Sequence, residues 1–213
     1  MLIFWALFFL ETGALHYLYK HRNVSVDITR KLLHICGGVM ALLIPMFFHS
    51  LLIVSLLLLL PLFFLGLTYF AGKLGAIHHT KRFSVGSIIF PVPVFICYWM
   101  YTSSGNAMLY YLPIALLTFA DPAAQFAGNY RAGKTRLLFN GRKTEAGSTA
   151  FFAVSLLCGV FSFMALSREL NVQAIAFIWL IAVIATLTEM ISFNGWDNIT
   201  VPLAAAALIG MII

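Results

Sequence analysis

The chain has 213 residues, of which 62% are hydrophobic and only 9% carry a charged side chain. Its 13 Lys and Arg outnumber the seven Asp and Glu, so the formal net charge is +6. This composition excludes an ordinary soluble domain and predicts an integral membrane protein. We expect no nucleic-acid partner.

Apolar runs follow one another along the chain, and most approach the ~20 residues that span a hydrocarbon core. They cover about residues 1–19, 35–48, 50–70, 85–102, 108–128, 147–167, 172–192 and 199–213. The sequence therefore predicts an all-α polytopic membrane protein with about eight transmembrane helices, of which the second and the last are short. No repeat or second domain is evident, so residues 1–213 are predicted to form one transmembrane domain.

Basic residues are concentrated in alternate connections between these runs. Twelve of the 13 Lys and Arg follow the first, third or fifth run, and the other is Arg168. Because cytoplasmic loops are enriched in Lys and Arg, this pattern places the basic connections in the cytoplasm and both termini on the opposite side. Any single one of these charges is also explained without a functional role, either by its effect on membrane topology or by attraction to anionic lipid headgroups.

The segment GNYRAGKT, residues 128–135, matches the phosphate-loop pattern of nucleotide-binding ATPases. Such a loop needs a buried strand before it and a long helix after it, so that backbone N–H groups converge on the phosphates. Here a run long enough for a membrane helix precedes it, and Asn140 and Gly141 would break a following helix. We therefore predict that this segment is not a phosphate loop.

Two acidic residues, Asp121 and Glu189, lie inside apolar runs. An ionised carboxylate is costly in a membrane unless it is paired, hydrated or metal-bound, so both are candidate functional residues. Pro122 is expected to loosen the helix beside Asp121, and Gln125 and Asn129 extend a polar stripe toward the basic connection. The structural alternative is that both carboxylates only pair with Lys or Arg between helices.

A second polar segment follows the seventh run, where Glu189 leads to Asn194-Gly195-Trp196-Asp197-Asn198 on the predicted cytoplasmic side. Carboxylates and basic groups from distant parts of the chain are thus expected on one membrane face. Nucleotide phosphates call for Lys and Arg, whereas Mg²⁺ takes one or two carboxylates and shares the phosphate oxygens. This combination favours a phosphotransferase that acts on a membrane lipid.

Four motifs, taken in order, carry a family resemblance. They are Arg30-Lys31-Leu32-Leu33-His34; Ala120-Asp121-Pro122-Ala123-Ala124; Gly133-Lys134 with Gly141-Arg142-Lys143-Thr144-Glu145-Ala146-Gly147-Ser148; and Glu189 with Asp197-Asn198-Ile199-Thr200-Val201-Pro202. Together they resemble the CTP-dependent lipid kinases, which include dolichol kinase, phytol kinase and the yeast-type diacylglycerol kinase. The resemblance covers residues 30–202. It departs from the family at Ala120, where Gly commonly precedes the aspartate.

The resemblance implies an enzyme that uses CTP and Mg²⁺ to phosphorylate the hydroxyl of a membrane lipid alcohol, giving a lipid monophosphate and CDP. It implies that the CTP phosphates lie on Lys134, Arg142 and Lys143. Asp121 and Asp197 are implied to hold Mg²⁺ or to orient the lipid hydroxyl, with Glu189 as a third catalytic carboxylate. The other residues implied to bind the nucleotide are Arg30, Lys31, His34, Thr144, Glu145 and Asn198.

Some of these roles have alternatives. Arg30 and His34 share a helix face, so they either contact phosphate together or belong to an amphipathic segment at the membrane edge. Glu145 could instead order the loop by pairing with Lys143 or Arg142. Asn198 could bind metal or cap the last helix.

Two other functions stay open. The segment around Lys143 also resembles CDP-diacylglycerol synthases, which implies a cytidylyltransferase that releases pyrophosphate. A transporter would instead use Asp121 and Glu189 to couple ions, although no inverted repeat is evident. The long basic connection favours the enzymes, and the predicted location is the cell membrane or the endoplasmic reticulum, with the active site facing the cytoplasm.

Overall fold

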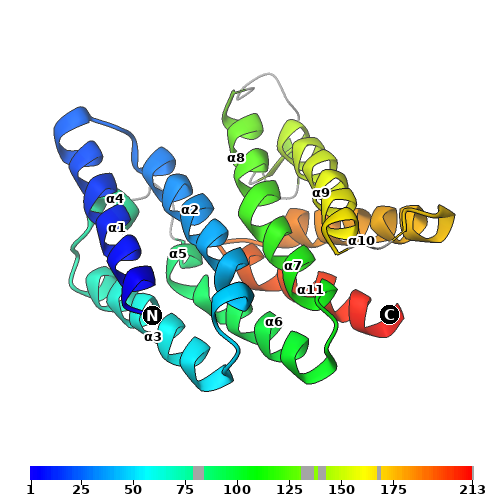
Figure 1. Ribbon diagram of the computed structural model, residues 1–213. Helices are drawn as coiled ribbons and strands as arrows, with labels where there is room; N and C mark the ends of the chain where they lie inside the picture. Colours follow the sequence, from blue (N-terminus) through cyan, green and yellow to red (C-terminus); the bar gives the residue numbers. More distant parts are fainter. Residues whose placement is uncertain (79–83, 131–136, 139–142, 167–168, 213) are drawn as a thin grey trace.

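The computed structural model describes residues 1–78, 84–130, 137–138, 143–166 and 169–212, and this part of the chain is almost entirely helical (Figure 1). The elements are α1 (Leu2–Arg22), α2 (Val26–Phe47), α3 (Leu51–Phe70), α4 (Gly75–His78), α5 (Gly86–Ile89), α6 (Pro91–Ser104), α7 (Met108–Ala115), the π-helix η1 (Leu116–Ala120), α8 (Asp121–Tyr130), β1 (Leu137–Leu138), β2 (Lys143–Thr144), α9 (Glu145–Ala165), α10 (Val172–Ile191) and α11 (Asp197–Ile212).

Six helical segments within the described ranges are long and apolar enough to cross a bilayer. They are α1, α2, α3, α5 with α6, α9 and α10. The apolar helix α11 is shorter, and α7, η1 and α8 follow one another over residues 108–130. The predicted fold class, an all-α membrane protein, is confirmed, whereas the number of eight spans and the side of the termini stay predictions.

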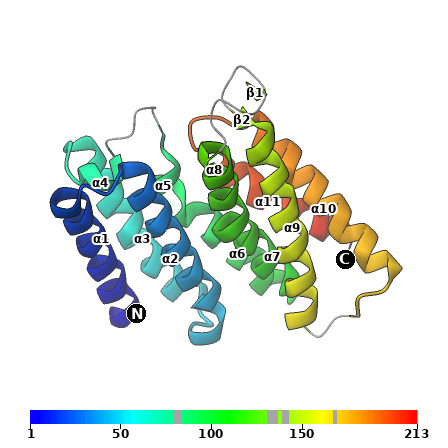
Figure 2. The same cartoon turned by 90° about the horizontal axis from the view of Figure 1, so that it is seen from above.

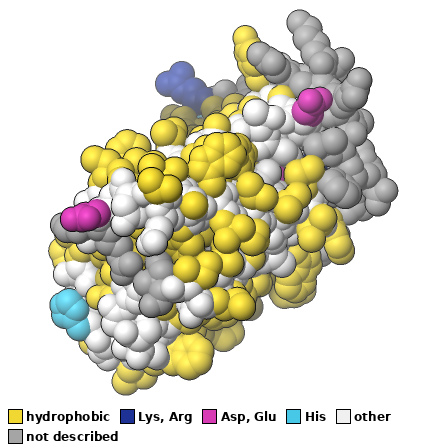
Figure 3. All heavy atoms as spheres, turned by 90° about the vertical axis from the view of Figure 1, so that its right-hand side faces the viewer, with side chains coloured by type: hydrophobic (Ala, Val, Ile, Leu, Met, Phe, Trp, Pro, Cys, Tyr) yellow, Lys and Arg dark blue, Asp and Glu magenta, His cyan; other side chains and the backbone are white. Residues whose placement is uncertain are grey.

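The surface is apolar over much of its area. Figure 3 shows a face whose middle is covered largely by hydrophobic side chains, with its few charged side chains toward the ends. Large apolar residues are exposed on several helices, among them Phe70, Trp99 and Val172. A lipid environment solvates such side chains, whereas soluble monomers rarely expose apolar patches of this extent. The surface therefore agrees with membrane embedding.

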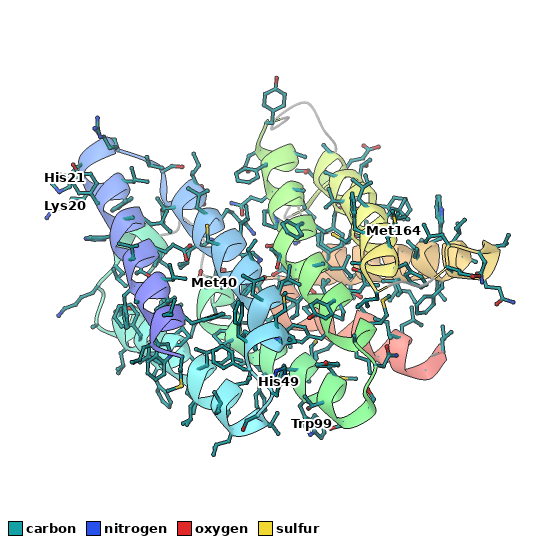
Figure 4. The ribbon with its side chains drawn as sticks, in the orientation of Figure 1. Lys20, His21, Met40, His49, Trp99 and Met164 are labelled. Carbon is teal, nitrogen blue, oxygen red and sulfur yellow. The ribbon has the colours of Figure 1, made fainter. Side chains whose placement is uncertain are left out.

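The ends of the helices form two opposite faces of the bundle. In Figure 1 the α1–α2 connection and the end of α8 lie at the top, whereas the α2–α3 and α6–α7 connections lie at the bottom. Figure 4 accordingly places Lys20 and His21 near the top and His49 and Trp99 at the bottom. The ends of α1 and α8, which both lead into basic segments of the sequence, therefore lie on the same side.

Two glycines allow neighbouring helices to pack closely. A Cβ built on Gly38 of α2 would overlap the side chain of Thr118 in η1, and one built on Gly159 of α9 would lie 2.5 Å from Ile178 Cγ2. Within a membrane, such close van der Waals packing is a main source of helix association. The contact of α2 with η1 matters most here, because the two elements carry facing parts of the candidate site.

One short pairing departs from the all-helical prediction. Strands β1 and β2 are antiparallel, with Leu137 opposite Thr144 and Leu138 opposite Lys143. The pairing leads directly into α9, whose N-cap is Thr144. It therefore positions Lys143 at the entry to that helix.

Candidate functional site

Helices α2 and α8 contribute the first cluster of the site. Lys31 forms an ion pair with Asp121, the first residue of α8, and His34 Nε2 lies 3.5 Å from the same carboxylate oxygen. The side chains are only 8%, 7% and 12% exposed for Lys31, His34 and Asp121. Because residues three apart share a helix face, α2 presents both side chains to the same carboxylate.

The backbone before Asp121 holds His34 in place. In the i to i+5 pattern of a π-helix such as η1, the Leu117 carbonyl would accept from the N–H of residue 122. Residue 122 is proline, which has no N–H. His34 Nε2 lies 2.7 Å from this carbonyl oxygen and donates the hydrogen bond, since a carbonyl oxygen can only accept. The π-turn and Pro122 thus create the acceptor that orients the imidazole.

Strand β2 and helices α10 and α11 contribute the second cluster. Lys143 Nζ lies 2.5 Å from Glu189 Oε1 and 2.9 Å from Asp197 Oδ2. Ser148, in the first turns of α9, lies with its Oγ 3.5 Å from Glu189 Oε2. Burial opposes the charge of Lys143, but the carboxylates of Asp197 and Glu189 outweigh it and raise the pKa of Lys143 above its ordinary value. The ammonium group is therefore charged at neutral pH.

The two clusters form one site, because the Asp121 carboxylate interacts electrostatically with Lys143 as well as with Lys31. Counted together, two ammonium groups face three carboxylates, which leaves one formal negative charge in excess: Lys31 and Lys143 against Asp121, Glu189 and Asp197. Buried carboxylates without a cation are strongly unfavourable. The described part of the site is thus suited to a further cation.

A tight turn positions Asp197 at the start of α11. Asn198 Nδ2 donates a 2.8 Å hydrogen bond to the Gly86 carbonyl. Gly195 has a φ of 87°, and a Cβ there would lie 2.5 Å from the Gly86 nitrogen. Glycine is needed at Gly195 both for this left-handed backbone and for the close approach. The Asn198 side chain, for which metal binding or capping was expected, fastens this turn to α5.

The sequence motifs are thus brought together in part. Six predicted residues meet at the site: Lys31, His34, Asp121, Lys143, Glu189 and Asp197. The interhelical pairs expected from the structural alternative are also present, since each of the two membrane carboxylates contacts a lysine. Lys134 and Arg142 lie outside the described residues.

Residues Thr144 and Glu145 lie at the start of α9. The Thr144 side chain accepts a 3.1 Å hydrogen bond from the Gly147 nitrogen and caps the helix. Glu145 is exposed in the first turn, where an acidic side chain stabilises the helix dipole. Among the described residues Lys143 pairs with Glu189 and Asp197 and not with Glu145, and the alternative partner of Glu145, Arg142, lies outside the described residues.

Gly128, the first residue of the phosphate-loop match, lies inside α8. No strand precedes it in the described chain, where η1 and α7 come before α8. A Cβ at Gly128 would lie 2.8 Å from Thr144 Oγ1. The glycine therefore allows α8 to pack against the start of α9, which accounts for its presence without a phosphate.

Two polar groups of the site were missed from the sequence. Ser148 lies at the end of the third sequence motif, which predicts no role for it, but its hydroxyl contacts Glu189. The Leu117 carbonyl could not be recognised, because no side chain marks it. Pro122 was the available signal, since a proline always leaves a carbonyl of the preceding turn without its N–H donor.

Whether the site suits Mg²⁺ can be judged from its donors. Among the described residues, no three His, Cys, Asp or Glu side chains gather around one point. Mg²⁺ bound with a nucleotide usually needs only one or two carboxylates, because phosphates and water supply the other ligands. Asp121 and Asp197 use only Oδ2 in their ion pairs with described residues, so each has Oδ1 for a metal. The donors fit such an ion.

Comparisons of the chain with protein-family models, with curated proteins and with solved structures found no match. The function is therefore inferred from the chemistry of the site and from the motif resemblance.

Proposed function

We propose that the protein is a CTP-dependent lipid kinase that transfers the γ-phosphoryl group of CTP to the hydroxyl of a membrane lipid alcohol. One observation carries this proposal: buried and half-buried acidic and basic side chains from α2, α8, β2, α10 and α11 converge on one site. A site of both charge signs at the end of a membrane bundle suits a reaction between a nucleotide and a lipid.

Asp121 is proposed to accept the proton of the lipid hydroxyl as its oxygen attacks the γ-phosphorus. The bond from that phosphorus to the β-phosphate oxygen breaks, and CDP leaves. Lys31 stabilises the ionised carboxylate, and His34, fixed by the Leu117 carbonyl, limits its movement. Phosphoryl transfer depends mainly on such positioning and on charge stabilisation.

Lys143 is proposed to neutralise developing charge on the transferred phosphate. Glu189 and Asp197 hold its ammonium group from two sides, so it is positioned before the nucleotide binds. Lys134 and Arg142 are proposed to bind the other phosphates. Mg²⁺, held by Asp197 and the phosphates, would supply further charge neutralisation.

Position-specific labelling of CTP tests the reaction. The purified protein is incubated with Mg²⁺, a panel of lipid alcohols and CTP labelled at either the γ- or the α-phosphate. The kinase proposal requires that γ-label enters the lipid, with release of CDP. Entry of the α-label, with release of pyrophosphate, would show a cytidylyltransferase, and no transfer of either label would contradict both enzymes. The double variant Lys31→Gln with Asp121→Asn, which removes both charges of the buried pair, provides the inactive control.

A further inference from the structure

A cavity lies between α1, α2, α3 and the start of α6, beside the charged site, and Figure 2 shows α1, α2 and α3 side by side. About 720 Å³ of its space is not filled by atoms, and this figure includes the part that is open to the surroundings. Its walls are mainly apolar, with side chains such as Phe8 and Leu65. The polar side chains that line it are Arg30, His34 and Ser87, besides Trp5.

The cavity is elongated along α2. Its lining includes residues from Arg30 to Ile44, a stretch of about 21 Å at 1.5 Å per residue. This exceeds one leaflet, which is about 15 Å of the ~30 Å hydrocarbon core. Met40, another lining residue, is on α2 midway between the two faces of the bundle (Figure 4). At the apolar end, Trp5 Nε1 donates a 3.1 Å hydrogen bond to the Leu57 carbonyl and joins α1 to α3.

The polar end of the cavity meets the candidate site through His34. This side chain lines the cavity, lies 3.5 Å from Asp121 and packs edge-on against Phe90. Arg30 lines the same end and forms no ion pair or hydrogen bond with any described residue. A guanidinium that has no partner in this described part of the chain is suited to bind a phosphate group.

We propose that this cavity holds the hydrocarbon chain of a single-chain lipid alcohol. Its hydroxyl group would lie at the polar end, beside Asp121, and Arg30 would bind the phosphate that the hydroxyl becomes. The inference rests on the proposed function and narrows its substrate class. The cavity is a single elongated space along one face of α2, so a diacylglycerol would have to leave its second chain outside.

Gly37 offers a way to fill the cavity. It lines the cavity, and a Cβ built on it meets no atom within 4 Å, so Gly37→Leu adds a side chain where space is open. Gly13 of α1 is the matched control, because its Cβ also meets no atom within 4 Å but the residue is exposed and outside the lining. Both changes replace Gly by Leu in a membrane helix, so their effects on helix propensity are similar.

The binding test uses the full chain in nanodiscs, without nucleotide, and a long-chain primary alcohol that carries a photoreactive diazirine near its end. We expect mass spectrometry to find crosslinks on the lining residues of α2 and α3. An excess of phytol should reduce this crosslinking by competing for the cavity, whereas an excess of diacylglycerol should not. Gly37→Leu should reduce the labelling by about tenfold, and Gly13→Leu should not change it. Labelling confined to exposed residues, or competition by diacylglycerol, would overturn the proposal.

The kinase assay separates this inference from the proposed function. Cavity labelling without any CTP-dependent phosphorylation would support the lipid site and contradict the kinase. Phosphorylation of single-chain alcohols at the same KM in wild type and Gly37→Leu would contradict the cavity and leave the kinase standing. If Gly37→Leu does not fold, the crosslinked positions in the wild-type protein decide the question by themselves.

Discussion

Asp121 is the residue on which the candidate site depends most. Its carboxylate contacts Lys31 and lies 3.5 Å from His34, and all three side chains are buried. A buried pair that loses one partner is destabilised by about 3–5 kcal/mol, because the remaining charge has no counter-ion. Asp121→Asn should therefore lower both the Tm and the activity, whether or not Asp121 has a catalytic role.

The double variant Lys31→Gln with Asp121→Asn separates the two roles. Both charges are removed and a neutral hydrogen-bonding pair remains, so we expect most of the lost Tm to return. Turnover at saturating CTP should stay reduced by about 10²- to 10⁴-fold, because no base accepts the hydroxyl proton. Thermal unfolding in detergent and the labelled-CTP assay measure these effects. A stable double variant with near-normal turnover would leave Asp121 with only its structural role.

Lys143 allows a prediction about pH. Its pKa is raised in the folded protein, so its charge stabilises the fold fully below the ordinary lysine value and is lost only as the pH rises through the raised value. The Tm difference between wild type and Lys143→Gln should therefore stay constant from about pH 7 to 9. A difference that shrinks over this range would show that the ammonium deprotonates there and is not held by Glu189 and Asp197.

The residue types of the site were predictable, but their partners were not. Lys31, Asp121, Lys143 and Glu189 could be recognised because charges are rare in this chain and costly in a membrane. Their pairing depends on which helices become neighbours, and Lys31 and Asp121 are 90 positions apart. Asn198 illustrates the same point, since its amide contacts a carbonyl on another helix that no local pattern identifies.

Helix α2 begins earlier than its apolar run. The run starts near residue 35, whereas the helix starts at Val26. Arg30, Lys31 and His34 lie in the part of the helix that precedes the run, and the ion pair with α8 and the hydrogen bond to η1 satisfy two of them inside the protein. A hydropathy profile places the end of a membrane helix at such residues, because it takes no account of their partners on other helices. The π-turn was likewise foreseen only as a loosening at Pro122.

The close contact between α2 and η1 can be tested by replacing two neighbouring glycines of α2, Gly38 and Gly37, with alanine. Gly38→Ala would place a methyl group against Thr118, whose Oγ1 is already bonded to the Ile114 carbonyl at 2.7 Å. We expect a loss of about 1–3 kcal/mol of stability, as for other overpacked sites, and lower activity as Lys31 moves from Asp121. Gly37→Ala has open space and should stabilise the helix by up to about 1 kcal/mol. Equal Tm values for the two variants would contradict this close contact.

The charged site and the apolar cavity require opposite environments. The ion pairs involve the N-terminal part of α2, the start of α8 and the end of α10, whereas the cavity extends along α2 to Ile44. A nucleotide is soluble in water and a lipid chain is not. A bundle that joins the two environments through His34 can therefore bring a water-soluble donor and a membrane acceptor to one carboxylate.

That arrangement works as a CTP-dependent enzyme only if the end of α8 faces the cytoplasm, where CTP is available. Tyr130→Cys at the exposed end of α8 and Ser104→Cys at the exposed end of α6 test the orientation in a protein whose Cys36, Cys97 and Cys158 are replaced by Ala. The basic connections predict that a membrane-impermeant maleimide labels Ser104→Cys in intact cells and Tyr130→Cys only after permeabilisation. The same accessibility for both would contradict a membrane crossing between residues 108 and 130. The reverse pattern would put the site on the side without CTP and would contradict the proposed kinase as well.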